Sequence, residues 1–256
     1  MKITAFNGSQ WGGNSNTQFM VDEFLAGACD CGCRVESISL VDHIVKPCTG
    51  CFECFGDKRG RCHISDDMQS LIRKFVNSNI VVLASPVYMD GVTGLMKTFI
   101  DRLLPVLDPH FEQDEAGEFR HASRHSRMPT FVVIANAHMP EESHFQVVKL
   151  FMQRIARTFH TSITAEIYRS TGGLLRSREE QFRPYIRAYK QLLRDAGQEL
   201  ALNGHISFHT EQELKKPLVP SDEYIEYANR MWDRLVGTSE VSGFAKIHSM
   251  LTALWA

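Results

Sequence analysis

The sequence predicts an α/β fold built on a doubly wound, mostly parallel sheet. Short apolar segments typical of buried strands alternate with segments that have helical patterns, and this alternation is the mark of successive βαβ units. Ile80 to Ala84 is a nearly unbroken apolar run, as expected for a central strand covered on both faces. With 256 residues and 43% hydrophobic content, the chain can form one large domain with an extension.

Five short apolar runs are predicted strands: Ile3 to Phe6, Val35 to Leu40, Ile80 to Ala84, Phe131 to Ala135 and Ile163 to Tyr168. The helices predicted around them are Asn16 to Ala28, Ser65 to Asn77, Thr93 to Leu104, Phe145 to Phe159 and Glu179 to Leu202. In the second helix, Ser65 is the expected N-cap, and Asp66 and Asp67 fall in the first turn, where the helix dipole favours negative charge. Five strands interleaved with helices in this way fit a flavodoxin-like sheet.

Two segments fall outside this alternation. Pro105 to Pro129 is polar, and Asp114 to Gly117 within it could turn a small hairpin near the rim of the sheet. After Gly204, residues 205–256 are expected to form a helical extension, which divides the chain into a domain of residues 1–204 and this extension.

The extension carries an apolar stripe at helical spacing. Ser221 opens a helix whose stripe consists of Ile225, Ala228, Trp232 and Leu235, and Phe244 to Trp255 adds further apolar residues. A stripe of this kind indicates packing or a subunit contact.

Charge and cysteine content limit the class of partner. Lys and Arg number 28 against 30 Asp and Glu, for a formal charge of −2, so we expect small-molecule or protein partners, no nucleic acid and no membrane. The N-terminus lacks the apolar region of a signal peptide, and no apolar run approaches the roughly 20 residues of a membrane span. These features predict a cytoplasmic protein, in which clustered thiols bind metal or do redox chemistry more often than they form disulfides.

The turn after the first strand, "NGSQWGGNSNT", can hold a phosphate. Its glycines allow a tight turn, and Ser9 and the run Asn14, Ser15, Asn16 and Thr17 offer polar groups where a helix N-terminus directs its free N–H groups. The turn lacks the Lys of a P-loop and the glycine spacing of the dinucleotide fingerprint, which disfavours ATP and a Rossmann NAD site. An ordinary Gly-rich β–α turn remains the alternative.

The turn after the third strand, "ASPVYMDGVTG", can receive a flat ring. It combines a stiffening Pro86, the aromatic Tyr88 and glycines that let a ligand approach the backbone. In an open α/β sheet, ligands bind beyond the carboxyl ends of the strands at the switch point, which strands one and three flank in the flavodoxin-like order. The two turns therefore predict a site for a mononucleotide with a planar head, such as FMN.

The segment "KPCTGCFECFGDKRGRC", within residues 46–63, places four cysteines close together: Cys48, Cys51, Cys54 and Cys62. Three thiolates separated by two residues each can close around one face of a 4Fe-4S cluster, and a fourth after a flexible stretch can reach the last iron. A structural zinc site, free or disulfide-forming thiols, and a loop without metal are the alternatives. Cys29, Cys31 and Cys33 have a spacing that suits no single metal, and we interpret them as incidental.

These motifs resemble those of the NADPH-dependent FMN reductase and iron-sulfur flavoprotein group of flavodoxin-like proteins. The resemblance extends over about residues 1 to 200 and includes "SPVY" and "GLMKTFIDR", although Gln10 and Trp11 stand where the group usually has Pro and Arg. It implies that Ser9 and Asn14 to Thr17 hold the FMN phosphate and that the cysteines named above ligate a 4Fe-4S cluster. It further implies flavin contacts from the third-strand turn and the end of the fourth strand: Pro86, Val87, Tyr88, Met89, Ala135 and Asn136.

The favoured function is an FMN-dependent redox flavoprotein with a 4Fe-4S cluster, which passes electrons between a two-electron and a one-electron partner. One alternative is an NAD(P)H-dependent FMN or quinone reductase without a cluster, and another is a non-catalytic module that senses flavin or redox state. NAD(P)H is a candidate substrate, and the resemblance implies a homodimer or homotetramer. The sequence assigns no catalytic acid, base or nucleophile, and it names neither the electron donor nor the acceptor.

Overall fold

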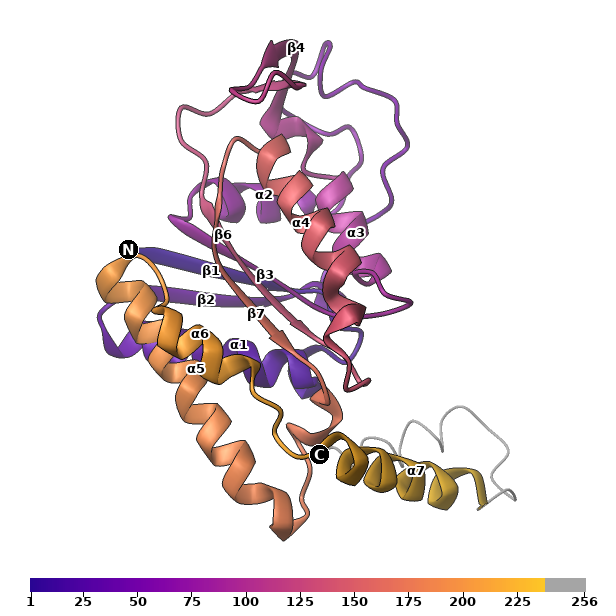
Figure 1. The fold of residues 1–256 in the computed structure, drawn as a ribbon. Coiled ribbons are helices and arrows are strands. Elements are labelled where there is room, and N and C mark those ends of the chain that lie inside the picture. Colours follow the sequence, from indigo (N-terminus) through magenta and orange to yellow (C-terminus); the bar gives the residue numbers. More distant parts are fainter. Residues whose placement is uncertain (238–256) are drawn as a thin grey trace.

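The computed structural model, which describes residues 1–237, contains the predicted five-stranded parallel sheet (Figure 1). The strands are β1 (Lys2–Asn7), β2 (Arg34–Ser39), β3 (Ile80–Pro86), β6 (Thr130–Asn136) and β7 (Ile163–Arg169). Their order across the sheet is β2-β1-β3-β6-β7, and every neighbouring pair is parallel. This order confirms the flavodoxin-like prediction and places the switch point between β1 and β3.

Helices cover both faces of the sheet (Figure 1). One face packs against α1 (Asn16–Asp30), α5 (Arg183–Asn203) and α6 (Phe208–Lys215). The opposite face packs against α2 (Met68–Val76), α3 (Gly94–Asp101) and α4 (Gln146–Thr158). The second layer is rich in aromatic contacts, and the rings that meet there are Phe6, Phe75, Phe99, Phe131 and Phe159. Burial on both faces explains why the central strand is an unbroken apolar run.

The start of α2 differs from the prediction. The helix begins at Met68 rather than at Asp66, and Asp67 precedes it with a helical backbone and no side-chain cap. The Asp66 carboxylate instead accepts hydrogen bonds from Arg102 Nη1 at 2.7 Å and Nη2 at 3.0 Å. The acidic residue expected to complement the helix dipole is therefore part of a buried ion pair.

This ion pair ties the segment before α2 to the end of α3. The Arg102 and Asp66 side chains are 1% and 0% exposed, and Arg102 Nη1 also donates to the carbonyl oxygen of Lys46 at 2.5 Å. Burial raises the pKa of Asp66, but hydrogen bonds from Arg102 and from the N–H groups of Lys46 and Met68 outweigh it and lower the pKa below its usual value. Both ends of the cysteine segment are thus fastened at one buried point.

Helices α1 and α5 cross at very close range because glycine stands on both sides of the contact. A Cβ added to Gly27 would lie 2.0 Å from the carbonyl oxygen of Arg194, and one added to Gly197 would lie 2.0 Å from that of Phe24. Both obstacles are backbone atoms, so a side chain at either position would force the helices apart.

The remaining elements are a hairpin and the C-terminal helices. The hairpin predicted within Pro105 to Pro129 is confirmed as β4 (Leu107–Gln113) and β5 (Phe119–Ser123), with Asp114 accepting a backbone hydrogen bond from Gly117 at 2.9 Å in its turn. After Gly204 come α6 and α7 (Ser221–Gly237), and α7 begins at the predicted Ser221. Among residues 1–237, no helix is both long and apolar enough to cross a bilayer.

The predicted stripe on α7 is only partly correct. Ala228 is buried, but Ile225 and Trp232 are more than two-fifths exposed. The face that packs onto the domain is shifted by one position and consists of Tyr224, Ala228 and Met231. The side chain of Leu235 and the segment Phe244 to Trp255 lie outside the described residues.

We expect Gly197→Ala to lower the free energy of unfolding by roughly 1–3 kcal/mol, the usual range for an overpacked core. Gly94→Ala is the matched control, because a Cβ there would meet nothing within 4 Å and alanine favours helix by up to about 1 kcal/mol. Urea unfolding of the three proteins measures both effects. Equal stability of Gly197→Ala and the wild type would contradict the close helix crossing.

Asp66→Asn leaves Arg102 buried without a counter-charge, so we expect a loss of roughly 3–5 kcal/mol in unfolding free energy at pH 7. The pKa of Asp66 in the folded protein lies below its ordinary value of 3.8. The contribution of the pair to the unfolding free energy is therefore present above pH 3.8 and is lost as the pH falls through the folded pKa. The difference between variant and wild type should therefore shrink in acid. Asp101→Asn is the control, because it removes an exposed pair with Lys97 and should cost at most about 0.5 kcal/mol. Similar losses of unfolding free energy in the two variants would refute the assignment of Asp66 and Arg102 as a buried ion pair.

Candidate functional site

A cavity of about 250 Å³ opens at the carboxyl edge of the sheet, between the turns that follow β1 and β3. Nine of its lining residues were predicted as ligand contacts: Ser9, Asn14, Ser15, Asn16, Thr17, Pro86, Val87, Tyr88 and Asn136. The structure therefore brings together segments that are far apart in the chain. The volume lies just below the range of small-molecule pockets, roughly 300–1,000 Å³, so a ligand of ordinary size would lie partly at the surface.

The first turn is arranged as an anion site. Ser15 caps α1: its Oγ accepts the Gln18 N–H at 2.9 Å and donates to the Gly12 carbonyl at 2.8 Å. Helix geometry leaves the N–H groups of Asn16 and Thr17 without intrahelical acceptors, at the positive end of the dipole. The Oδ1 atom of Asn16 is buried without a hydrogen-bond partner among the described residues. The N–H groups of Asn16 and Thr17 fit a phosphate, whereas the Asn16 Oδ1 atom is an acceptor and would need a donor; no Lys or Arg is among the residues found to line this cavity.

Direct contacts hold the two turns and the end of β6 in register. Thr93, the N-cap of α3, donates from Oγ1 to the Gly8 carbonyl at 2.6 Å. A Cβ on Gly8 would lie 2.8 Å from Cβ of Met96, so this position requires glycine. Asn136 Nδ2 donates to Thr17 Oγ1 at 2.7 Å, and both residues line the cavity. The cavity is thus formed by a fixed framework.

Two residues of the predicted flavin set lie elsewhere. Met89 is fully exposed in a turn with φ of 48°, and Ala135 is 1% exposed within the core on the far side of β6. Neither lines the cavity. Ala135 is excluded because side chains alternate along a strand, so that its neighbour Asn136 faces the cavity instead.

The structure adds Trp11, His138 and Gly173 to the lining. Trp11 lies in the turn after β1, at a position where the FMN reductase group that the motifs resemble usually has a basic residue. Gly173 lies in the turn after β7. The glycine pair Gly172-Gly173 was the available signal, because it follows the last strand at the same edge of the sheet.

A larger groove of about 780 Å³ runs along β7, α4 and the hairpin turn. Charged side chains in it already pair with one another: Arg157 Nε lies 2.6 Å from Asp114, and Lys149 Nζ lies 3.7 Å from Glu166. The smaller cavity at the switch point, with its free N–H groups, is the better candidate for a ligand.

The four clustered cysteines surround a single small cavity beside the end of α3, together with Arg102 and Pro105. All seven cysteines of the chain lie in the described region, and none forms a disulfide. Burial, followed by the neighbouring thiols of Cys62, Cys48 and Cys51, raises the pKa of the Cys54 thiol. The structure therefore places all four cysteines around one cavity.

The four cysteine sulfurs do not have the spacing of a formed tetrahedral zinc site. A tetrahedral zinc site with Zn–S bonds of about 2.3 Å requires sulfurs roughly 3.8 Å apart. Within the described chain, no three cysteine sulfurs lie within 4.8 Å of one another. The four thiols are the ligand type that both zinc and iron-sulfur clusters take, and their spacing here is not that of a formed zinc site.

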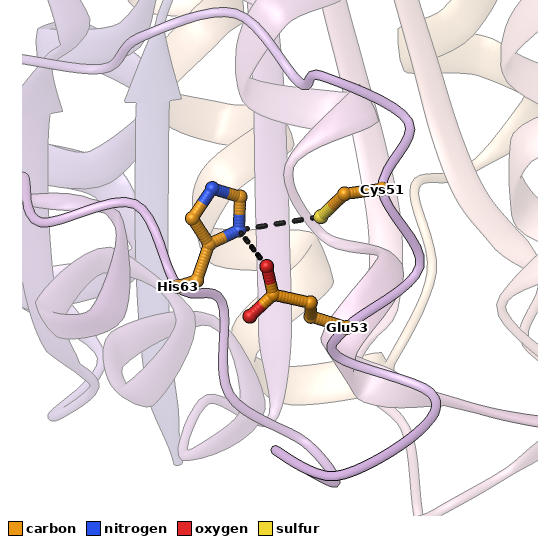
Figure 2. Close-up of side chains that lie close together, drawn as sticks. All are labelled: Cys51, Glu53 and His63. Carbon is orange, nitrogen blue, oxygen red and sulfur yellow. Dashed lines mark hydrogen bonds and ion pairs between the residues drawn. The ribbon is translucent and has the colours of Figure 1, made fainter.

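A second donor set overlaps the cysteines (Figure 2). Nδ1 of His63 lies 3.2 Å from Sγ of Cys51 and 3.6 Å from Oε1 of Glu53, and Figure 2 shows the three side chains converging. Sequence reasoning missed Glu53 and His63, although each lies within two residues of a predicted ligand. Because Cys51 is shared, this set and a four-cysteine cluster cannot both be filled at once.

The cysteine cavity lies away from the cavity at the switch point, although the cysteine loop follows β2, whose carboxyl end is at the same edge of the sheet. Thr93, at the start of α3, contacts Gly8 in the turn after β1. Arg102, just after the end of α3, lines the cysteine cavity. The eight residues of α3 are roughly 12 Å long, so the helix separates the two sites within one chain.

Residues 1–121 match the model of the NADPH-dependent FMN reductase family. An iron-sulfur flavoprotein of Methanocaldococcus jannaschii is 35% identical over 106 residues, which make up 41% of this chain and 53% of the relative. An iron-sulfur flavoprotein of Archaeoglobus fulgidus is 42% identical over 90 residues, or 35% of this chain and 40% of the relative.

Among solved structures, an FMN-dependent NADH-azoreductase from Bacillus anthracis in complex with FMN superposes with a TM-score of 0.58 and 13% identity, covering 78% of this chain and 99% of that one. At this identity the likeness shows the fold alone. The chain spans about half the length of the curated relatives it matches, 53% and 40% for the two named. Residues 1–121 are therefore similar to the NADPH-dependent FMN reductase family, and parts of the chain are similar to iron-sulfur flavoproteins, in agreement with the resemblance carried by its motifs.

Proposed function

We propose that this protein is an FMN-dependent oxidoreductase that also carries a 4Fe-4S cluster and passes electrons between a two-electron and a one-electron partner. The observation that carries the proposal is the cavity at the switch point, where a helix N-terminus and an aromatic turn face the same space. The family match over residues 1–121 and the names of the relatives support the same conclusion.

In this proposal, the protein binds both the phosphate and the isoalloxazine ring of FMN. The N–H groups of Asn16 and Thr17, with the Ser9 and Ser15 region, hold the phosphate at the N-terminus of α1. Pro86, Val87 and Tyr88 lie against the ring from one side, and Asn136 and His138 line the other. When bound, FMN supplies the ability to accept two electrons as hydride and to release them singly. NAD(P)H is the proposed hydride donor.

The cysteine cavity is the proposed cluster site, with Cys48, Cys51, Cys54 and Cys62 as ligands. A cluster there would carry one electron at a time, and its potential would depend on burial and on hydrogen bonds to the sulfurs. The Arg102 and Asp66 pair fixes the ends of the loop and so preorganises the ligands before the cluster binds. A reducing compartment such as the cytoplasm would keep these thiols available.

The separation of the two sites by α3 favours an oligomer. A homodimer or homotetramer can bring the cysteine cavity of one subunit close to the flavin cavity of its neighbour, whereas a single chain holds them at opposite ends of the helix. Ile225 and Trp232 on the outer side of α7 are exposed apolar side chains available for such a contact.

The proposal as a whole is tested by anaerobic purification. The purified protein is assayed for flavin, iron and labile sulfide and then tested for NAD(P)H oxidation. We expect about one FMN and about four irons per chain, together with NAD(P)H turnover. Flavin without iron would support the reductase that lacks a cluster. Well-folded protein that takes up neither flavin nor iron would refute the proposed function.

Cys62→Ser should remove most of the iron and sulfide, because it deletes one of the four cluster ligands, and should leave the FMN content unchanged. Cys29→Ser is the matched control, since Cys29 is exposed at the end of α1 and should not alter either content. Iron retained at the wild-type level in Cys62→Ser would contradict the assignment of this ligand.

A further inference from the structure

The C-terminal extension contacts the wall of the proposed flavin cavity. The Tyr224 hydroxyl on α7 lies 3.0 Å from Nδ1 of His138, and the His138 side chain lines the cavity. The two rings are 5.7 Å apart in an edge-on arrangement. Tyr224 is 2% exposed and belongs to the main apolar core, so this end of α7 is held in place by packing.

The turn after β7 encloses the same contact. A Cβ added to Gly173 would lie 2.9 Å from Nδ1 of His138 and 3.2 Å from the Tyr224 hydroxyl. Glycine is therefore required where the histidine and the tyrosine meet. The Nδ1 atom of the imidazole therefore contacts Tyr224 beside Gly173, while His138 as a residue lines the cavity.

The direction of the hydrogen bond follows from burial. Within residues 1–237, His138 Nδ1 is the hydrogen-bond partner found for the Tyr224 hydroxyl, and a buried hydroxyl hydrogen without an acceptor is costly. Burial lowers the pKa of His138 and raises that of Tyr224, so both groups are neutral near pH 7. A neutral imidazole has one acceptor nitrogen and one N–H donor. If Nδ1 accepts from Tyr224, the hydrogen is on Nε2.

We propose that Tyr224 is a positioning residue for the flavin site: its hydroxyl donates to Nδ1 of His138 and thereby selects the tautomer that presents Nε2–H to the cavity. The Nε2–H group is then a fixed donor for a carbonyl oxygen or an unprotonated nitrogen of the isoalloxazine ring, and this second step rests on the proposed function. Helix α7 lies beyond the 121 residues matched by the family model. The proposal therefore gives the C-terminal extension a role at the flavin site, and no residue of the family match supplies that role.

Two measurements test the proposal in Tyr224→Phe. Nitrogen-15 NMR of the free protein should show His138 protonated at Nε2 with a hydrogen-bonded Nδ1 in the wild type, and a changed Nδ1 signal in the variant. The FMN dissociation constant should rise roughly 2–10-fold, the effect of one lost hydrogen bond. Tyr227→Phe is the matched control on the same helix, because its hydroxyl contacts Ser177 at 3.3 Å instead of the cavity wall; neither signal should change.

A double-mutant cycle with His138→Ala separates positioning from general packing. If Tyr224 acts through His138, Tyr224→Phe should have no further effect on FMN affinity in the His138→Ala background, while each single variant keeps its thermal unfolding midpoint close to that of the wild type. Equal weakening in both backgrounds, or a wild-type His138 protonated at Nδ1, would overturn the proposal. A wild type that binds no FMN would refute the proposed function instead, and the NMR result on the free protein would still decide the role of Tyr224.

Discussion

The parallel pairing of β1 with β3 is the constraint on which the rest of the site depends. Their register aligns Asn7 with Ala84, and the Gly8 N–H continues it by donating to the Ala84 carbonyl at 2.8 Å. Because β2 and β6 extend the sheet in opposite directions from this pair, α1 and α3 pass to opposite faces and leave a space between the turns that precede them. For this reason, the turn after β1 and the turn after β3, which contains Tyr88, face each other.

The same arrangement determines where the cysteines lie. Helix α3 starts against the turn after β1 and carries Arg102 immediately after its last residue, and Arg102 binds both Lys46 and Asp66 at the ends of the cysteine segment. One helix therefore connects the two candidate sites and also keeps them apart. An internal buried ion pair contributes little net stability, but its loss leaves an unpaired charge, which suits a role in fixing the geometry of a loop that has few apolar contacts of its own.

Local sequence patterns predicted the strands, their order and most of the cavity, because apolar runs, glycine turns and an N-cap serine act over short distances. They did not predict contacts made between distant segments. Asp66 resembles a first-turn residue of α2 until Arg102, 36 residues away, is placed beside it. Likewise, Trp11 and Gly173 line the cavity, and Tyr224 reaches His138 in its wall, only through tertiary packing. The α7 stripe was displaced by one position because a helical pattern does not reveal which of two apolar faces finds a partner.

The central claim is that a flavin phosphate is held at the N-terminus of α1 while its ring lies against the turn after β3. A crystal structure of the protein soaked with FMN tests this most directly. The account predicts the phosphate within hydrogen-bond distance of the N–H groups of Asn16 and Thr17, and the ring between Tyr88 and His138. An ordered flavin bound elsewhere on the protein, with the cavity at the switch point empty, would contradict it.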